Sequence, residues 1–185
     1  FVTGMGYMTL VRGDRQINYF PATANTTVLR DKGALYTGNF VAPVGAGQFA
    51  SIGNPYASAI DFLLLTKTGS IDDKFYVWDP LLTNNANGYG GYQCLSATNS
   101  WKPVPGGTAN YDANTAYTTI QSGQAFFVFS SGSGGTVSFT ESAKVNGSLA
   151  ANRPGDLNGN RQFFRLNMYN ANNILTDGNI IAFDP

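Results

Sequence analysis

Hydrophobic and polar residues alternate with a period of two along much of the chain. Val137 and Phe139 alternate with polar neighbours, and so do Phe164, Leu166 and Met168. Such alternation places one face of a β-strand on a core and the other in solvent. Further strand signals lie at 5–12, 15–20, 34–41, 48–52, 74–78, 124–129, 161–169 and 179–183. Because clusters of Gly, Asn, Pro and Ser separate them, the pattern predicts an all-β fold, an antiparallel, jelly-roll-like β-sandwich.

One segment carries a helical signal. Ile60, Leu63 and Leu64 follow the i, i+3, i+4 spacing of a helix face, and Ser58 is the expected N-cap. We therefore expect at most one short helix. The region 82–114 is rich in Asn, Gly and Pro and is predicted to form long loops, which are common places for a binding surface.

Small and polar residues interrupt the strand rhythm at 147–160. We predict a β-sandwich module over residues 1–150 and a terminal β-hairpin within 151–185. A two-stranded hairpin is only marginally stable alone. It is therefore expected to complete the sandwich, to begin a second β domain that is truncated here, or to pair with another molecule.

The charge balance excludes several partners. The 185 residues include 11 Lys+Arg and 11 Asp+Glu, so the net charge is zero. Without a basic cluster the chain lacks the usual means of binding nucleic acid or anionic lipid. No apolar run approaches the roughly 20 residues that span a bilayer, so we expect no membrane insertion.

The residue types also argue against catalysis. There is no His and a single Cys. A Ser-His-Asp triad and a Cys-His pair therefore lack their His base, and the usual zinc sites lack their His and Cys ligands. Cys94 is expected to be an inert thiol. Glycoside hydrolysis would need two paired carboxyls, but Asp61, Asp79 and Glu141 are each explained as turn, cap or surface residues. We therefore expect a protein that is not an enzyme and needs no cofactor.

A weak metal motif lies in the terminal third of the chain. Asp156, Asn158 and Asn160 place oxygen ligands at alternate positions around Gly159, as calcium loops do. A full loop needs a distal Glu, which residues 161–168 do not contain. The competing interpretation is a solvated turn rich in Asn and Asp.

Aromatic residues gather in the loop-rich central region. They are Tyr89, Tyr92, Trp101, Tyr111 and Tyr117. Sugar C–H faces pack on aromatic rings, and neighbouring amides can bond sugar hydroxyls, so these residues are candidates for a glycan platform. In the alternative interpretation the rings pin a long loop to the sandwich, with the Tyr hydroxyls reaching water.

Several motifs occur in a fixed order along the chain. They are 6–14 (GYMTLVRGD), 35–38 (LYTG), 52–61 (IGNPYASAID), 75–80 (FYVWDP), 90–92 (GGY) and 120–127 (IQSGQAFF). Together they resemble a β-rich module of large secreted surface proteins from Bacteroidota, which commonly carry a C-terminal sorting domain of the type IX secretion system. The resemblance covers roughly residues 4–185. It implies an extracellular or cell-surface location upstream of a sorting domain, and an adhesin-like architecture rather than an activity.

These observations lead to one functional expectation. We expect a non-catalytic structural or adhesion module that contacts other copies or other domains of the same surface protein. Low charge favours such contacts, because few charges must lose their water. The terminal hairpin could pair with an edge strand of a neighbour and build a fibre or filament. The alternative is a carbohydrate-binding module that uses the loop aromatics.

Overall fold

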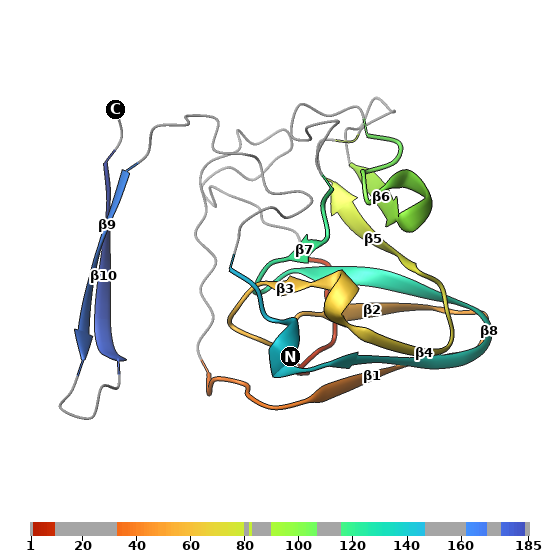
Figure 1. The fold of residues 1–185 in the computed structure, drawn as a ribbon, viewed down its shortest axis with the longest axis horizontal. Helices are drawn as coiled ribbons and strands as arrows, with labels where there is room; N and C mark the ends of the chain where they lie inside the picture. The colour runs from red at the N-terminus through yellow and green to blue at the C-terminus, as the bar shows by residue number, and fades with distance from the viewer. Residues whose placement is uncertain are drawn as a thin grey trace, which may run out of the picture. The chain divides into compact units, whose positions relative to one another are not determined.

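The structure is a computed structural model that describes residues 2–9, 33–79, 82, 90–106 and 116–146 together with two C-terminal strands (Figure 1). The chain divides into two compact units, Phe1–Asn152 and Arg153–Pro185. The strands of the first unit are β1 (Phe40–Val44), β2 (Phe49–Gly53), β3 (Ile60–Asp61), β4 (Thr66–Ile71), β5 (Lys74–Asp79), β6 (Gly91–Ser96), β7 (Thr119–Ile120) and β8 (Ala125–Phe139). All their pairings are antiparallel, which confirms the predicted all-β antiparallel fold.

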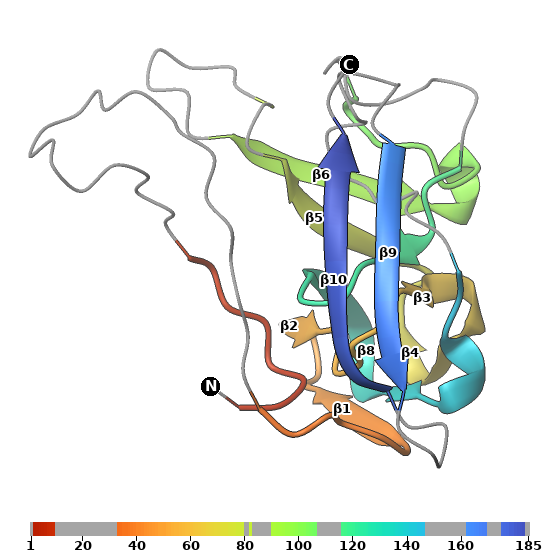
Figure 2. The ribbon, with the colours of Figure 1, turned by 90° about the vertical axis from the view of Figure 1, so that its left-hand side faces the viewer.

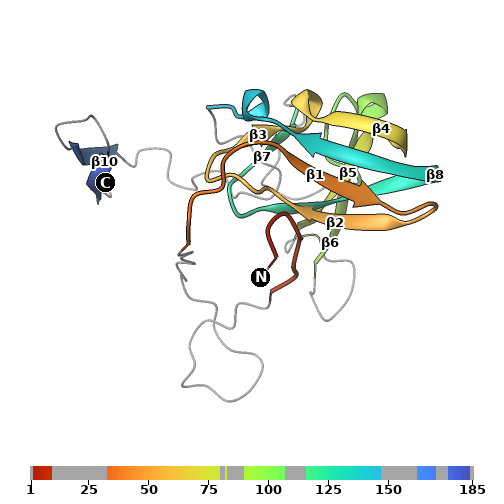
Figure 3. The same ribbon diagram turned by 90° about the horizontal axis from the view of Figure 1, so that it is seen from below.

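Strand β8 organises the main sheet. Its first half lies between β2 and β5, where Gly53 pairs with Ala125 and Tyr76 pairs with Phe127, and β6 follows beyond β5. Its second half lies between β1 and β4. The strand order is therefore β2-β8-β5-β6 at one end of β8 and β1-β8-β4 at the other. Figure 3 shows the two halves of β8 one above the other, joined at the bend on the right.

The inward-facing positions of β8 change parity at this bend. Phe126 and Val128 are buried in the first half, whereas Val137 and Phe139 are buried in the second. The first pair has even residue numbers and the second pair has odd ones, so strict alternation cannot place both pairs on the inner side. The strand must therefore contain one extra residue, as a β-bulge does, between the two pairs. The intervening residues 131–135 are only Ser and Gly, which bend without a large side chain having to be placed.

The neighbouring strand accommodates the same bend. The pairing of β4 with β8 shifts register between Gly69 and Ile71. Gly69 has a φ of +69°, and a Cβ there would lie 2.2 Å from the carbonyl oxygen of Gly134. Only glycine permits both this conformation and this approach. A strand that bends in this way passes from one layer to the other and lets the two layers pack face to face.

Aromatic rings fill the space between the layers. Phe126 and Phe139, from the two halves of β8, have ring centroids 6.3 Å apart. Phe62 meets Phe126 edge-on at 5.9 Å and lies 4.5 Å from Phe75 on β5. All four side chains are almost fully buried. Rings of this size supply much of the apolar area that drives folding.

The helical signal at residues 58–64 corresponds to a smaller element than an α-helix. Ile60 belongs to β3, and the turn is the 3₁₀ helix η1 (Phe62–Leu64). Ser58 is not its N-cap: Asp61 takes that position and accepts a hydrogen bond from the Leu63 N–H at 2.9 Å. Asp61 is the extended residue directly before the turn, whereas Ser58 is too far upstream to reach it.

Two further 3₁₀ turns are η2 (Ala97–Asn99) and η3 (Glu141–Ala143), and the described residues contain no α-helix. No helix in the described part of the chain has the length and hydrophobicity that a bilayer crossing requires.

Four strands lie where the sequence pattern did not predict a strand: β3, β4, β6 and β7. β6 falls inside the region 82–114, for which the sequence predicts loops. The strand is not evident from the sequence because its buried inward position Gln93 is polar and interrupts the alternation of apolar residues. β4 has the sequence Thr-Lys-Thr-Gly-Ser-Ile, which is polar because the strand forms a sheet edge. β1 begins at Phe40, later than the predicted 34–41 segment.

The second unit contains an antiparallel hairpin. β9 (Gln162–Tyr169) pairs with β10 (Leu175–Phe183), with Phe164 opposite Ile181 (Figure 2). The pairing shifts register between Leu175 and Asp177. The hairpin strands at 161–169 and 179–183 are thus present, and the second is longer than predicted.

Replacing Phe126 with Ala should destabilise the domain strongly. Phe126 is 1% exposed, and truncating a buried Phe typically costs about 3–5 kcal/mol. Phe49→Ala is the matched control, because Phe49 is 56% exposed and should cost only about 1 kcal/mol through its ring contacts. Urea denaturation followed by fluorescence would measure both. Equal losses would contradict the assignment of Phe126 to the core.

Candidate functional site

The sheet β2-β8-β5-β6 carries a second set of aromatic rings on the face that points away from the core. We call this set the aromatic face, and it consists of Phe49, Tyr76, Trp78, Tyr92, Phe127 and Phe129. These residues alternate along their strands with the buried inward positions. Both sides of this sheet are therefore aromatic.

The rings of the aromatic face contact one another across four strands. Phe49 lies 5.5 Å from Tyr76 and 6.5 Å from Phe127, between ring centroids. Tyr92 lies 5.5 Å from Phe127 and 5.0 Å from Trp78. These four pairs meet edge to face, a favourable arrangement for aromatic pairs. The result is a continuous row of rings from β2 to β6.

Parts of this row are open to solvent. Phe49 is 56% exposed and Tyr92 is 40% exposed, while the other rings are half-buried. The apolar run at 126–129 predicts a central strand covered on both sides. The structure confirms the central position of this segment, but its outer side is covered only in part.

The N-terminal segment adds to the edge of this sheet. The Gly6 N–H donates to the Ser51 carbonyl at 3.1 Å, and the Gly53 N–H donates to the Gly4 carbonyl at 2.9 Å. A Cβ on Gly6 would lie 2.2 Å from the Ser51 hydroxyl oxygen, so only glycine allows this approach. The chain at 6–9 is thereby held beside the aromatic face.

A groove of about 260 Å³ lies between residues 6–9 and the aromatic face. Small residues, Ser51 and Ala125, line it on β2 and β8, and the larger Trp78 and Tyr92 line it on β5 and β6. The remaining lining residues are Gly6, Tyr7, Met8, Thr9, Tyr76 and Phe127. None of the described residues that line this groove has a charged side chain.

Two ionisable groups of this face are held in their neutral forms. Burial raises the pKa of the Tyr76 hydroxyl above its ordinary value of 10.0. Burial also raises the pKa of the neighbouring Cys94 thiol above its ordinary value of 9.0. Cys94 is thus protonated at neutral pH and a poor nucleophile, in keeping with an inert thiol.

The three described residues of the predicted glycan platform do not lie on one surface. Tyr92 lies on the aromatic face, whereas Trp101 packs on the core side, 5.6 Å from Phe62. Tyr117 is also buried, and its N–H donates to the Trp101 carbonyl at 2.9 Å. Trp101 and Tyr117 therefore fit the alternative interpretation, in which rings pin the loop to the sandwich.

The other predicted site residues lie outside the described residues. This applies to Tyr89 and Tyr111 of the glycan platform and to Asp156, Asn158 and Asn160 of the calcium motif. Within the described ranges, no cluster of three or more His, Cys, Asp or Glu is arranged to hold a metal ion. The sequence pattern predicts a strand at 5–12, but of the described residues 5–9 only Met5 pairs, in an isolated bridge with Ile52. Nothing in the local pattern indicates that Gly6 lies beside β2 and that residues 6–9 form a wall of the groove.

The acids singled out from the sequence have structural partners. Asp61 caps η1, as described above. Asp79 is fully buried and accepts a hydrogen bond from the Gln93 amide at 3.0 Å. Gln93 in turn accepts from the Gly106 N–H at 2.8 Å. This buried network holds the strand pair β5–β6 to the loop that follows β6.

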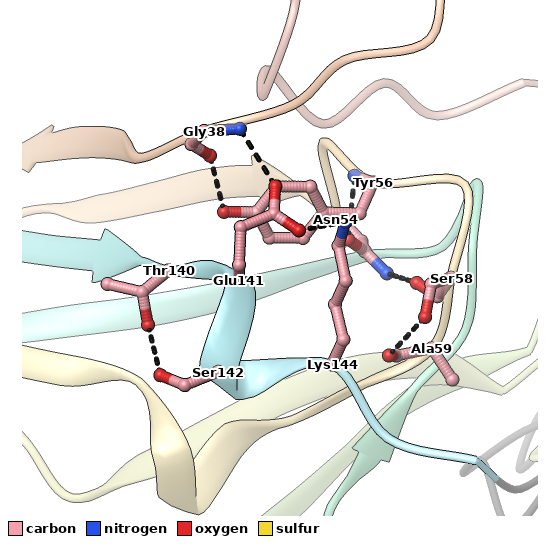
Figure 4. Close-up of polar contacts among 9 residues, drawn as sticks. All are labelled: Gly38, Asn54, Tyr56, Ser58, Ala59, Thr140, Glu141, Ser142 and Lys144. Atoms are coloured by element: carbon pink, nitrogen blue, oxygen red, sulfur yellow. Dashed lines mark hydrogen bonds and ion pairs between the residues drawn. The ribbon is translucent and has the colours of Figure 1, made fainter.

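Glu141 belongs to a polar cluster at the end of β8 (Figure 4). Its carboxylate accepts from the Gly38 N–H at 2.8 Å and pairs with Lys144. The Tyr56 hydroxyl donates to the Gly38 carbonyl at 2.8 Å, and the Lys144 ammonium lies 4.4 Å from the centre of the Tyr56 ring. The N–H and the carbonyl of Gly38 are thus both hydrogen-bonded. These contacts hold the segment before β1 to η3.

Asn54 forms the second half of this cluster (Figure 4). Its side-chain oxygen accepts from the Tyr56 N–H at 3.0 Å, and its amide donates to the Ser58 carbonyl at 2.8 Å and the Gln121 carbonyl at 3.1 Å. Asn54 is 8% exposed, so its polar atoms need these partners. The arrangement stabilises a turn, and we assign the cluster a structural role.

A family model described as a domain of unknown function, DUF8693, matches residues 1–180, and the chain belongs to this family. The match extends over the first unit and most of the second. Comparison with curated proteins and with solved structures found no match.

Glu141→Gln should make stability less dependent on pH. Hydrogen bonds from Lys144 and from the Gly38 N–H lower the pKa of Glu141 below its ordinary value of 4.5. A lowered folded-state pKa adds stability above the unfolded-state pKa, and this stability is lost as pH falls through the folded-state value. The wild type should therefore exceed Glu141→Gln in urea midpoint near neutral pH. The gap should close in acid, and a gap constant across the acid range would contradict the assigned ion pair.

Proposed function

We propose that this domain is a non-catalytic extracellular module of a secreted bacterial surface protein, with a structural or adhesive role. The observation that carries the proposal is the aromatic face. The inner face of this sheet already supplies the core. Folding therefore does not require exposed aromatic rings on the outer face. Such patches are typical of interaction surfaces.

The composition of the face supports contact with protein. Aromatic residues are enriched in the cores of protein interfaces and dominate their energetics. Phe49 stands at the β2 end of the face with more than half of its surface exposed. Burying such rings against a partner gains apolar burial without the cost of removing water from charges. The partner we propose is another copy or another domain of the same surface protein.

Strand pairing extends this proposal towards a fibre. β1 and β4 are the outer strands of the order β1-β8-β4. β1 contains Pro43, which lacks an N–H and blunts that edge, whereas β4 contains no proline. We propose that the β9–β10 hairpin of one copy pairs with β4 of the next. The extracellular location rests on the family resemblance carried by the ordered motifs of the sequence.

Phe49→Ser should weaken association between copies. Sedimentation equilibrium of the full chain should show association that depends on concentration, and the variant should weaken it at least about tenfold, as expected for an interface hot spot. Leu63→Ser is the matched control, since Leu63 is 48% exposed but lies on η1 rather than on the aromatic face. A wild type that stays monomeric, or an equal effect of both variants, would contradict the proposed contact between copies.

Ile180→Pro should abolish fibres. Proline removes a backbone N–H from β10 and prevents regular ladder pairing. Electron microscopy of the concentrated protein should show polymers for the wild type and for Ile180→Val, which keeps the N–H. Dispersed wild-type monomers at high concentration would refute the fibre extension.

A further inference from the structure

The groove beside Trp78 and Tyr92 differs in chemistry from the Phe49 end of the aromatic face. Its lining combines apolar rings with hydroxyl-bearing side chains, among them Thr9 and Ser51. A purely apolar ligand would take these hydroxyls out of water without replacing their hydrogen bonds. A ligand that presents both C–H groups and hydroxyls meets both kinds of surface. Sugars have this composition.

The electrostatics restrict the ligand further. The described lining residues carry no Lys or Arg to compensate an acidic sugar and no carboxylate to compensate a basic group. Placing a charge in such a site costs free energy that none of the described lining residues returns. The chemistry therefore favours an uncharged ligand over a sialylated, sulfated or uronic acid-containing one.

The shape of the groove favours one inserted ring over a flat polymer surface. The Trp78 and Tyr92 rings meet at 76°, and Tyr92 and Phe127 meet at 89°. Rings at such angles share no common plane, so they cannot form a flat platform for a crystalline polysaccharide. The volume of about 260 Å³ lies just below the usual range for small-molecule sites, about 300–1,000 Å³, and suits a single sugar residue.

The wall opposite these rings is held in place by backbone contacts. Residues 4–6 bond to β2 on both sides of Met5, and the Tyr7 hydroxyl accepts from the Val2 N–H at 2.9 Å. A site whose walls are already positioned loses less conformational entropy when a ligand binds.

We propose that this groove binds one residue of an uncharged oligosaccharide, with Trp78 and Tyr92 as the main contacts. The proposal rests on the adhesive role proposed above and names the chemical class that one part of the aromatic face recognises. It places the saccharide site on the outer face of the sheet rather than on the loops at 89–117.

A glycan array tests this directly. The full chain would be applied to neutral hexose and N-acetylhexosamine oligosaccharides printed beside sialylated and sulfated ones. The wild type should bind neutral members, and Trp78→Ala and Tyr92→Ala should each reduce binding at least about tenfold. Tyr92 is 40% exposed, so its replacement should leave the fold intact even if Trp78→Ala destabilises the protein. Leu63→Ser, on η1 and outside the groove, should bind as the wild type does.

Several results would overturn the inference. They are no binding by the wild type, binding of charged glycans alone, or full binding by folded Tyr92→Ala. Wild-type binding to insoluble cellulose or chitin with no binding to soluble oligosaccharides would contradict the inserted-ring geometry. Sedimentation separates the two proposals: a silent array with association between copies that depends on Phe49 rejects only the saccharide site. If Tyr92→Ala weakens that association as Phe49→Ser does, and the array is silent, the groove belongs to the contact between copies.

Discussion

The bend in β8 is the constraint on which the first unit depends. Strand β8 crosses from one layer to the other. At residues 131–135 the set of its side chains that points inward changes. Without that change, Val137 and Phe139 would point to solvent and the second layer would have no inward apolar face. The close approach of Gly69 to Gly134 lets β4 follow the same path. The core therefore depends on a segment that itself contributes almost no hydrophobic side chain.

The same sheet explains the origin of the aromatic face. β5 alternates Phe75 and Val77, which are buried, with Tyr76 and Trp78, which point outward. Aromatic residues at two successive outward positions are unnecessary for folding, because the inner rings already supply the core. The chain carries only 12% charged residues, about half the usual share. A weakly charged, aromatic outer face is consistent with a module that works by contact.

The two ends of the aromatic face suggest a division of roles. At the β2 end, Phe49 and Phe129 pack ring to ring at 4.7 Å and offer an apolar surface. Beside Trp78 and Tyr92, the small residues Ser51 and Ala125 leave a groove whose lining includes hydroxyl groups. We propose a protein partner for the first and a saccharide for the second, and one module can use both. Neither role requires a catalytic group.

Much of the fold could be predicted from residue order alone, because a period of two in apolar residues directly indicates a strand with one buried face. The sequence by itself determined the all-β class, most of the strands and the terminal hairpin. β6 escaped prediction because a buried Gln93 breaks the apolar pattern, and its burial is satisfied by Asp79 and Gly106, which are distant in sequence. Only the tertiary structure showed that Tyr92 lies on the aromatic face while Trp101 packs on the core side. It also showed that residues 6–9 lie beside Tyr92. These relations depend on which strands pair and how β8 bends, and such long-range contacts leave no local signature in the chain.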